Sequence, residues 1–113
     1  MKMKRLLLLV SAIGLPLAIP LSTHAASFDC AKAGTTVERQ ICGDPTLSRM
    51  DEQLNKVYRE ALATGPKPEL LTSVQRDWLK DVRNQCANVQ CLRDAYQSRL
   101  DDFLSPGKPS AGK

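Results

Sequence analysis

The chain has 113 residues, of which 42% are hydrophobic and 25% charged, and its formal net charge is +4. This length fits one domain with a modest core. Without the three basic residues at its start, Lys2, Lys4 and Arg5, the chain keeps 13 of its 16 basic residues against 12 acidic ones, a balance that excludes the strongly basic footprint of a nucleic-acid-binding protein.

The first 25 residues are typical of a secretory signal peptide. An apolar run over residues 6–19 follows the basic start, and Thr23 and Ala25 are the two small residues expected before a cleavage site. The alternative is a membrane anchor, but the run holds about 14 residues, whereas a bilayer core needs roughly 20. We therefore expect cleavage after Ala25 and a periplasmic or secreted protein.

The sequence before Cys30 argues against a lipid anchor. Phe28 and Asp29 precede this cysteine, in place of the small apolar residues of a lipoprotein signal. We expect a mature helical domain over residues 26–104, with no stable membrane anchor after cleavage. The segment 105–113 is rich in Pro, Gly, Ser and Lys, which predicts a disordered tail.

A short helix is predicted at the start of the mature domain. Thr35 and Glu38 stand three residues apart, as in a capping box, in which the first side chain caps the helix and the second reaches back to it. The helix is predicted to run to about Ile41 and to end at Gly43.

The second helix is predicted to begin with Asp44 as its N-cap and Pro45 at its first position. Apolar residues then recur at helical spacing through residue 62, and the Thr-Gly-Pro-Lys-Pro run over 64–68 ends the pattern. Charged residues that can pair at i,i+4 occupy the opposite face: Glu52, Lys56 and Glu60.

The third helix is predicted from about Glu69 to Gln85. Its expected buried residues are Leu71, Val74, Trp78 and Val82. Its other face is expected to carry one exposed basic stripe, made of Arg76, Lys80 and Arg83. This stripe is either a solvated face or a contact surface for an acidic cleft or an anionic envelope polymer, because the planar fork of arginine can grip a carboxylate with two hydrogen bonds.

The fourth helix is predicted to end at about Leu104. Its expected buried residues are Leu92, Tyr96, Leu100 and Phe103. No segment alternates as a β-strand does. The predicted fold class is therefore all-α, a small disulfide-stapled helical bundle with one short N-terminal helix and three longer antiparallel helices.

Three aromatic residues lie at the centres of the apolar faces. We expect Tyr58, Trp78 and Tyr96 to meet in one core as structural residues, with their polar ends reaching partners at its edge.

Asp51 lies on the border of the buried face of the second helix, where a carboxylate needs a partner. Arg93 and Arg99 flank Tyr96 and are the candidate partners. The prediction is an ion pair that fixes the order of the helices, with a binding role as the alternative.

The four cysteines are Cys30, Cys42, Cys86 and Cys91, and an even count in a short exported chain predicts two disulfides. Three pairings are possible. We favour Cys30–Cys42 and Cys86–Cys91, because each pair is close in sequence and brackets a predicted turn. A zinc site made of all four is the alternative, but the chain contains no C-x-x-C motif.

The residues do not suggest an enzyme. The single histidine, His24, would leave with the signal peptide, which removes the commonest general base and metal ligand. There is no Gly-rich phosphate loop and no G-x-S-x-G motif. Neighbouring carboxylates at 51–52 and 101–102 point about 100° apart on a helix and do not face each other. We expect no catalytic residues, no metal and no cofactor, and a protein that acts by binding.

Two groups of residues resemble the LprI-type lysozyme inhibitor family. The first group is Cys30, the run Val37-Glu38-Arg39-Gln40-Ile41-Cys42, Asp44-Pro45-x-Leu47, Asp51 and Tyr58. The second group is Gln75-Arg76-x-Trp78-Leu79, Arg83, Cys86, Cys91-Leu92, Tyr96 and Arg99. The match covers nearly all of residues 30–104.

This resemblance implies an exported helical domain with its four cysteines in disulfides, and inhibition of lysozyme as a protein partner. It carries over no catalytic residues. The chain lacks the lipoprotein cysteine and the larger companion domain of some relatives, so membrane attachment is not expected. The alternative function is an envelope structural or binding module with a partner other than lysozyme.

Overall fold

The computed structural model describes residue 14 and residues 26–107. The predicted signal peptide, apart from Gly14, and the predicted tail beyond Gly107 lie outside the described residues. Within these ranges the elements are all helical, which confirms the all-α prediction. They are η1 (Cys30–Lys32), α1 (Thr36–Gly43), α2 (Pro45–Thr64), α3 (Pro68–Asp81), η2 (Arg83–Gln85) and α4 (Val89–Leu104).

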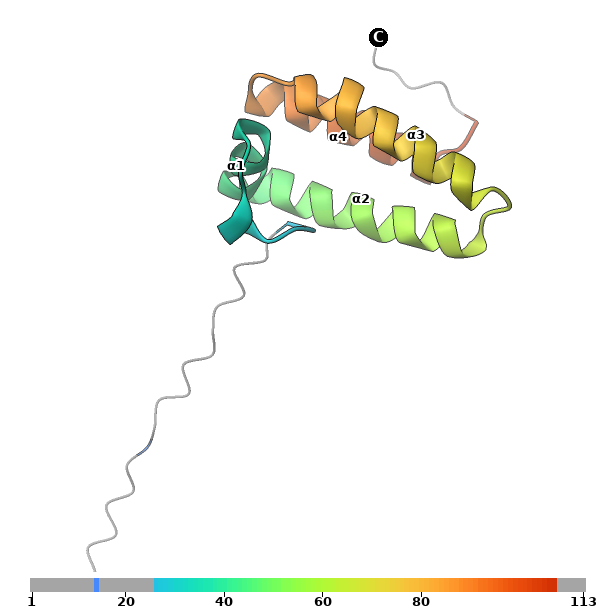
Figure 1. Ribbon diagram of the computed structural model, residues 1–113, viewed down its shortest axis with the longest axis horizontal. Coiled ribbons are helices and arrows are strands. Elements are labelled where there is room, and N and C mark those ends of the chain that lie inside the picture. Colours follow the sequence, from blue (N-terminus) through green and yellow to red (C-terminus); the bar gives the residue numbers. More distant parts are fainter. Residues whose placement is uncertain (1–13, 15–25, 108–113) are drawn as a thin grey trace, which may run out of the picture.

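The three long helices pack with their axes roughly aligned. α3 runs antiparallel to α2 and α4, which point the same way (Figure 1). Short connections between successive helices impose this antiparallel order. α1 crosses one end of the bundle, and the turn between α2 and α3 lies at the other end (Figure 1). No helix among the described residues has the length and apolar character needed to cross a bilayer.

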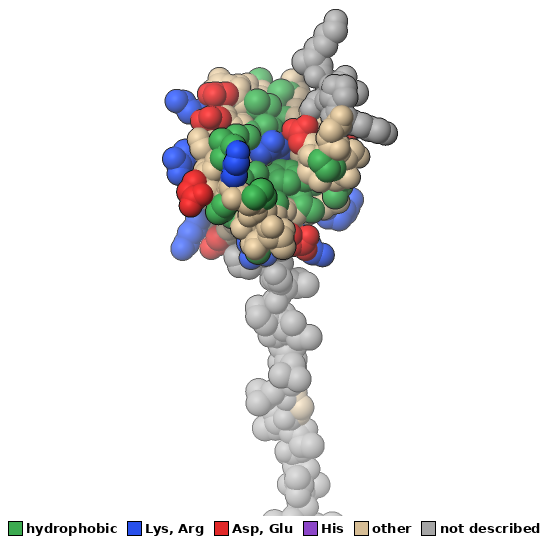
Figure 2. All heavy atoms as spheres, turned by 90° about the vertical axis from the view of Figure 1, so that its right-hand side faces the viewer, with side chains coloured by type: hydrophobic (Ala, Val, Ile, Leu, Met, Phe, Trp, Pro, Cys, Tyr) green, Lys and Arg blue, Asp and Glu red, His purple; other side chains and the backbone are tan. Residues whose placement is uncertain are grey.

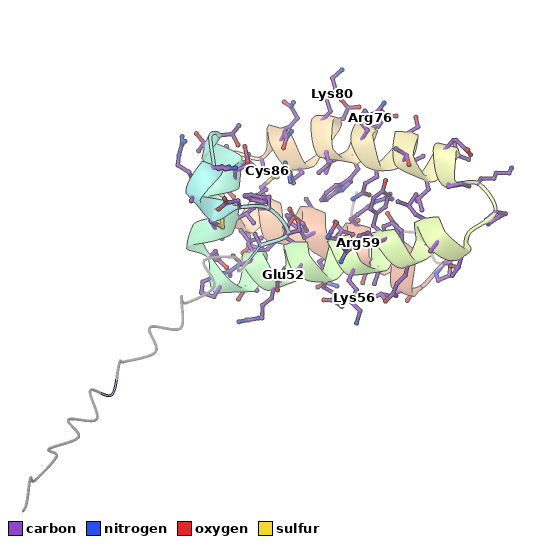
Figure 3. The ribbon with its side chains drawn as sticks, turned by 60° about the horizontal axis from the view of Figure 1, so that its bottom comes forward. Glu52, Lys56, Arg59, Arg76, Lys80 and Cys86 are labelled. Carbon is purple, nitrogen blue, oxygen red and sulfur yellow. A yellow bond between two sulfur atoms is a disulfide. The ribbon has the colours of Figure 1, made fainter. Side chains whose placement is uncertain are left out.

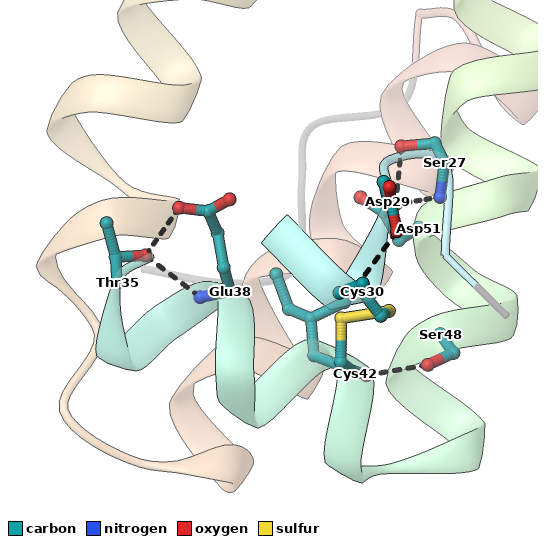
Figure 4. The surroundings of a disulfide bond; sticks show 10 residues. Ser27, Asp29, Cys30, Thr35, Glu38, Cys42, Ser48 and Asp51 are labelled. Carbon is teal, nitrogen blue, oxygen red and sulfur yellow. Dashed lines mark hydrogen bonds between the residues drawn. A yellow bond between two sulfur atoms is a disulfide. The ribbon is translucent and has the colours of Figure 1, made fainter. Parts of the chain in front are cut away.

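The predicted helix starts are confirmed. The Thr35 Oγ1 accepts from the Glu38 backbone N–H at 3.1 Å and donates to the Glu38 carboxylate at 2.9 Å, which fixes the start of α1 (Figure 4). Asp44 Oδ1 accepts from the Leu47 N–H at 3.0 Å, and Pro45 occupies the first turn of α2. Because Asp44 also ends α1, these two helices meet at a single residue, and α1 extends through Gly43.

The core lies between α1, α2 and α4. Its most deeply buried apolar and aromatic side chains are Ile41, Leu47, Leu92 and Tyr96. Leu100 is buried with them, as predicted, whereas Phe103 packs only partly buried against the edge of this cluster.

The prediction for α3 is wrong at its end and on part of its face. The helix stops at Asp81, and a separate 3-10 turn follows. Val74 and Val82 are 42% and 44% exposed, whereas Gln75 is buried. The chain must leave the helix here, because the buried Cys86 lies in the turn that leads to α4 and is tied to Cys91.

Both favoured disulfide pairings are confirmed. Cys30–Cys42 joins the N-terminal segment to α1 with a Cα–Cα distance of 5.8 Å (Figure 4). Cys86–Cys91 closes the turn before α4 with a Cα–Cα distance of 5.4 Å. All four sulfur atoms are therefore bonded, and the alternative of a four-cysteine zinc site is contradicted.

Candidate functional site

A cavity of about 300 Å³ opens between α2, α3 and the segment before η1. We call it the aspartate pocket. Its lining combines apolar and aromatic side chains with acidic, amide and basic groups. The lining residues are Ser27, Phe28, Glu38, Asp51, Leu54, Asn55, Tyr58, Gln75, Trp78, Leu79 and Arg83.

Asp51 lines this pocket and is 5% exposed. Its Oδ1 accepts from the Tyr96 hydroxyl at 2.6 Å. Its Oδ2 accepts from the Ser27 N–H at 2.7 Å and from the Ser27 Oγ–H at 2.5 Å (Figure 4). Three donors thus compensate the cost of burying the carboxylate, and they join α2 to α4 and to the N-terminal segment.

The predicted ion pair between Asp51 and Arg93 or Arg99 is wrong. Arg93 instead pairs with Asp44, with its Nη2 2.7 Å from Oδ2, and so ties α4 to the junction of α1 and α2. Arg99 donates from Nε to the Gln75 Oε1 at 2.9 Å. Neutral donors reach Asp51 because the phenol of Tyr96 and the segment before η1 occupy the space beside it.

The environment of Tyr96 keeps its hydroxyl protonated. Burial is the main cause that raises the pKa of Tyr96 above its ordinary value, and the charge of Asp51 and the hydrogen bond to it add to the shift. The positive charge of Arg83 partly opposes this rise in the pKa. The hydroxyl is therefore a stable donor to Asp51.

Of the three aromatic residues expected to meet in one core, Trp78 and Tyr96 are in ring contact, whereas Tyr58 lies outside the core cluster. The rings of Trp78 and Tyr96 pack edge to face, with centroids 5.3 Å apart and an interplanar angle of 77°. Tyr58 lines the aspartate pocket with Trp78, and its hydroxyl donates to the Thr72 Oγ1 at 3.4 Å. The polar ends of both tyrosines thus have partners, while Trp78 and Tyr58 present part of their surface to the pocket.

The basic side chains do not form one continuous stripe. Arg76 and Lys80 lie exposed along α3 and point away from the other helices (Figure 3). Arg83 is half-buried, lines the aspartate pocket and donates from Nε to the Asn84 Oδ1 at 3.0 Å. The expectation of an unbroken row fails because α3 ends at Asp81, which removes the helical spacing that would have aligned Arg83 with the other two.

Two side chains of the site, Ser27 and Gln75, have roles that sequence pattern did not predict. Gln75 stands four residues after Leu71 and three before Trp78, and this spacing could have placed it on the inner face of α3. Ser27 precedes every helix that the structure describes, and it carries no periodic signal. Within the described ranges, no group of three or more His, Cys, Asp or Glu side chains is arranged to hold a metal ion.

A sequence model of the family described as "Lysozyme inhibitor LprI" matches residues 29–103. This chain belongs to the lysozyme inhibitor LprI family. Similar curated proteins are the lipoproteins LprI of Mycobacterium bovis and Mycobacterium tuberculosis, each 34% identical to it over 82 residues. The alignment covers 69% of this chain and 41% of each relative, so the chain spans about two fifths of their length. No solved structure matches it.

The family resemblance and the pocket coincide in space. Seven of the residues through which the chain resembles the LprI family in its two halves line the same cavity: Glu38, Asp51, Tyr58, Gln75, Trp78, Leu79 and Arg83. They come from α1, α2, α3 and η2, so the fold brings them together from separate parts of the sequence. This convergence marks the aspartate pocket as the candidate functional site of this LprI-family chain.

Proposed function

We propose that this LprI-family chain is an exported binding protein that inhibits a lysozyme through the outer face of α3 and the mouth of the aspartate pocket. The observation that carries the proposal is the family match over residues 29–103. Its two disulfides agree with an oxidising compartment outside the cytoplasm, where such bonds form and persist.

The chemistry of lysozyme suggests what the inhibitor offers. Lysozyme cleaves its polymer with two carboxyl groups that flank a cleft. Exposed cationic donors that enter the cleft could hydrogen-bond these groups and block access of the substrate. Arg76 and Lys80 lie four residues apart on the outer face of α3, and arginine can hold a carboxylate with two parallel hydrogen bonds.

Local complementarity would have to dominate this contact. The described helices carry acidic and basic residues in near balance, which gives little long-range attraction toward a charged enzyme. Steering is therefore weak, and the fit of α3 and the pocket mouth to the enzyme determines the affinity.

The test is the lysis of bacterial cell walls by lysozyme in the presence of the oxidised protein. We expect inhibition at near-stoichiometric amounts. The double variant Arg76→Glu/Lys80→Glu should weaken inhibition at least tenfold. The matched control, Lys56→Glu/Arg59→Glu, makes the same charge change at exposed positions of α2 and should inhibit like the parent protein (Figure 3).

The two parts of the proposal fail separately. Unchanged lysis rates with excess parent protein would reject lysozyme inhibition. Inhibition by the parent protein with equal effects of the two double variants would reject α3 as the contact surface while keeping the function.

A second candidate, an envelope module with a partner other than lysozyme, is favoured by the aspartate pocket itself. A cavity of about 300 Å³ that combines aromatic rings with convergent polar groups is typical of a site for a small ligand group. Retention of the protein on soluble cell-wall fragments, with no effect on lysozyme, would select this function. Loss of that retention in Trp78→Ala, with the helical circular dichroism signal intact, would assign it to the pocket.

A further inference from the structure

A second cavity, of about 450 Å³, lies at the end of the bundle opposite α1. We call it the apolar groove. It shares no lining residue with the aspartate pocket. Its lining residues are Ala61, Gly65, Pro66, Lys67, Leu70, Leu71, Val74, Arg99, Asp102, Phe103 and Pro106. Figure 2 faces this end of the molecule and shows a hollow among hydrophobic side chains with a basic side chain inside it.

Large hydrophobic side chains are exposed at this groove. Leu70 is 56% exposed and Val74 is 42% exposed, both on the face of α3 that the sequence pattern assigned in part to the core. Leu71 and Phe103 are half-buried beside them. Contiguous apolar surface of this kind marks an interaction site more often than a solvated face. The cavity volume lies within the roughly 300–1,000 Å³ that is usual for small-molecule sites.

Arg99 supplies a buried cation to the same groove. It is 8% exposed, and its guanidinium carbon lies 4.8 Å from the centroid of the Phe103 ring. Its Nε donates to Gln75 at 2.9 Å, and its Nη1 lies 3.4 Å from the Asp102 carboxylate. Its Nη2 is buried and finds no acceptor among the described residues. A buried donor without an acceptor is unfavourable, so an anionic group beside Arg99 would satisfy it.

We propose that the apolar groove binds a long-chain carboxylate, with the aliphatic chain against Leu70, Val74 and Phe103 and the carboxylate at Arg99. The charge of the lining favours this head group. Two cations, Arg99 and Lys67, line the groove with one acid, Asp102, so a carboxylate is attracted and an amine is repelled. The inference stands apart from lysozyme inhibition, because it concerns another cavity and another chemistry.

The experiment titrates dodecanoate, below its micelle concentration, into the oxidised full chain and measures the heat of binding. We expect one saturable site per chain. Dodecanol and dodecylamine, which have the same chain length with a neutral and a cationic head, should bind at least tenfold more weakly. Arg99→Gln should remove the preference of the groove for dodecanoate over dodecanol.

A matched pair of variants locates the site. Leu70→Glu places a carboxylate in the groove and should weaken dodecanoate binding at least tenfold. Leu104→Glu makes the same change at a residue that is also 56% exposed but does not line the groove, and it should leave binding unchanged. Both changes are at exposed positions, so circular dichroism should show the parent fold even if Arg99→Gln fails to fold.

Four results would overturn the proposal. The first is the absence of saturable binding of dodecanoate. The second is equal affinity for dodecylamine, and the third is an equal loss of dodecanoate binding in the Leu70 and Leu104 variants. The fourth is retention of the chain on phosphatidylcholine vesicles without binding of dodecanoate monomers, which would assign the groove to contact with a membrane surface.

Discussion

The Tyr96 hydroxyl donates a 2.6 Å hydrogen bond to the Asp51 carboxylate in the interior of the bundle. This bond connects α4 to α2 and fixes Asp51, which lines the aspartate pocket. The same carboxylate anchors Ser27, so one buried acid organises three parts of the chain. Its contribution can be measured, because Tyr96→Phe removes the donor and keeps the ring.

Tyr96→Phe should lower the free energy of unfolding by about 1–3 kcal/mol, because the buried Asp51 loses a donor that no other group replaces. Urea unfolding followed by circular dichroism measures the change. Tyr58→Phe is the control, since the bond from Tyr58 to Thr72 is long at 3.4 Å, and it should cost about 0.5 kcal/mol or less. A larger loss in the control than in Tyr96→Phe would contradict the role of the buried pair.

The Tyr96 hydroxyl should also make the free energy of unfolding depend on pH in the alkaline range. The folded protein raises the pKa of Tyr96 above the ordinary 10.0, so the unfolded chain releases this proton more readily. The stabilising contribution is complete below pH 10 and is lost as the pH rises above it. The difference in unfolding free energy between the parent protein and Tyr96→Phe should therefore shrink from pH 9 to pH 11. A constant difference over this range would contradict the assignment.

Asp44 predicts the opposite dependence at acid pH. The Leu47 backbone N–H, followed by Arg93, lowers the pKa of this carboxyl below 3.8. Its contribution is therefore complete above pH 3.8 and is lost as the pH falls through the lower folded value. Asp44→Asn keeps an N-cap but removes the charge. The loss of unfolding free energy that this variant shows relative to the parent protein should therefore disappear as the pH is lowered. Asp44→Ala, which also removes the cap, should remain less stable than Asp44→Asn at every pH.

Replacement of two glycines by alanine should change the free energy of unfolding in opposite directions. A Cβ at Gly65 would lie 2.6 Å from the carbonyl oxygen of Ala61. The Gly65 N–H donates a hydrogen bond of 2.8 Å to the same oxygen. Gly65→Ala should therefore lower the unfolding free energy by about 0.5–3 kcal/mol. A Cβ at Gly43 meets nothing within 4 Å in the last turn of α1, so Gly43→Ala should raise it by up to about 1 kcal/mol. Thermal unfolding of both variants tests the pair, and a stabilising Gly65→Ala would contradict it.

Local signals predicted the parts of the fold that depend on neighbours in the sequence. Thr35 and Asp44 cap the helices at the expected positions because a cap is set by residues three positions away. The end of α3 was not predicted, since nothing near Val82 resembles a helix stop. The position of Cys86 in a turn tied to Cys91 requires that break, and periodicity does not report such a constraint.

The sequence predicted several individual residues of the candidate site but not the way they come together. Asp51, Tyr58, Trp78 and Arg83 were singled out from the sequence, but their grouping in one pocket was not. The donors to Asp51 lie 24 and 45 residues away, beyond the reach of any helical pattern. An arginine partner was expected on chemical grounds, and the structure satisfies the same need with a phenol, a hydroxyl and a backbone amide.

The two disulfides should contribute unequally to stability. Chain entropy alone predicts a cost of about 3 kcal/mol for loss of Cys30–Cys42 and about 2 kcal/mol for loss of Cys86–Cys91, because the first closes the longer loop. The actual gap between the two losses should be larger than chain entropy predicts. The reason is that Ser27 lies three residues before Cys30 and donates twice to Asp51. Release of this segment would leave the buried carboxylate with one donor.

We therefore expect Cys30→Ser/Cys42→Ser to lower the free energy of unfolding by at least about 2 kcal/mol more than Cys86→Ser/Cys91→Ser does. The extra loss comes from the unmet hydrogen bonds of a buried charge. Urea unfolding measures both losses. Hydrogen exchange at the Ser27 amide separates the causes, because it should accelerate in the first double variant and not in the second. Equal losses with a protected Ser27 amide in both variants would show that Asp51 holds the N-terminal segment without the help of the disulfide.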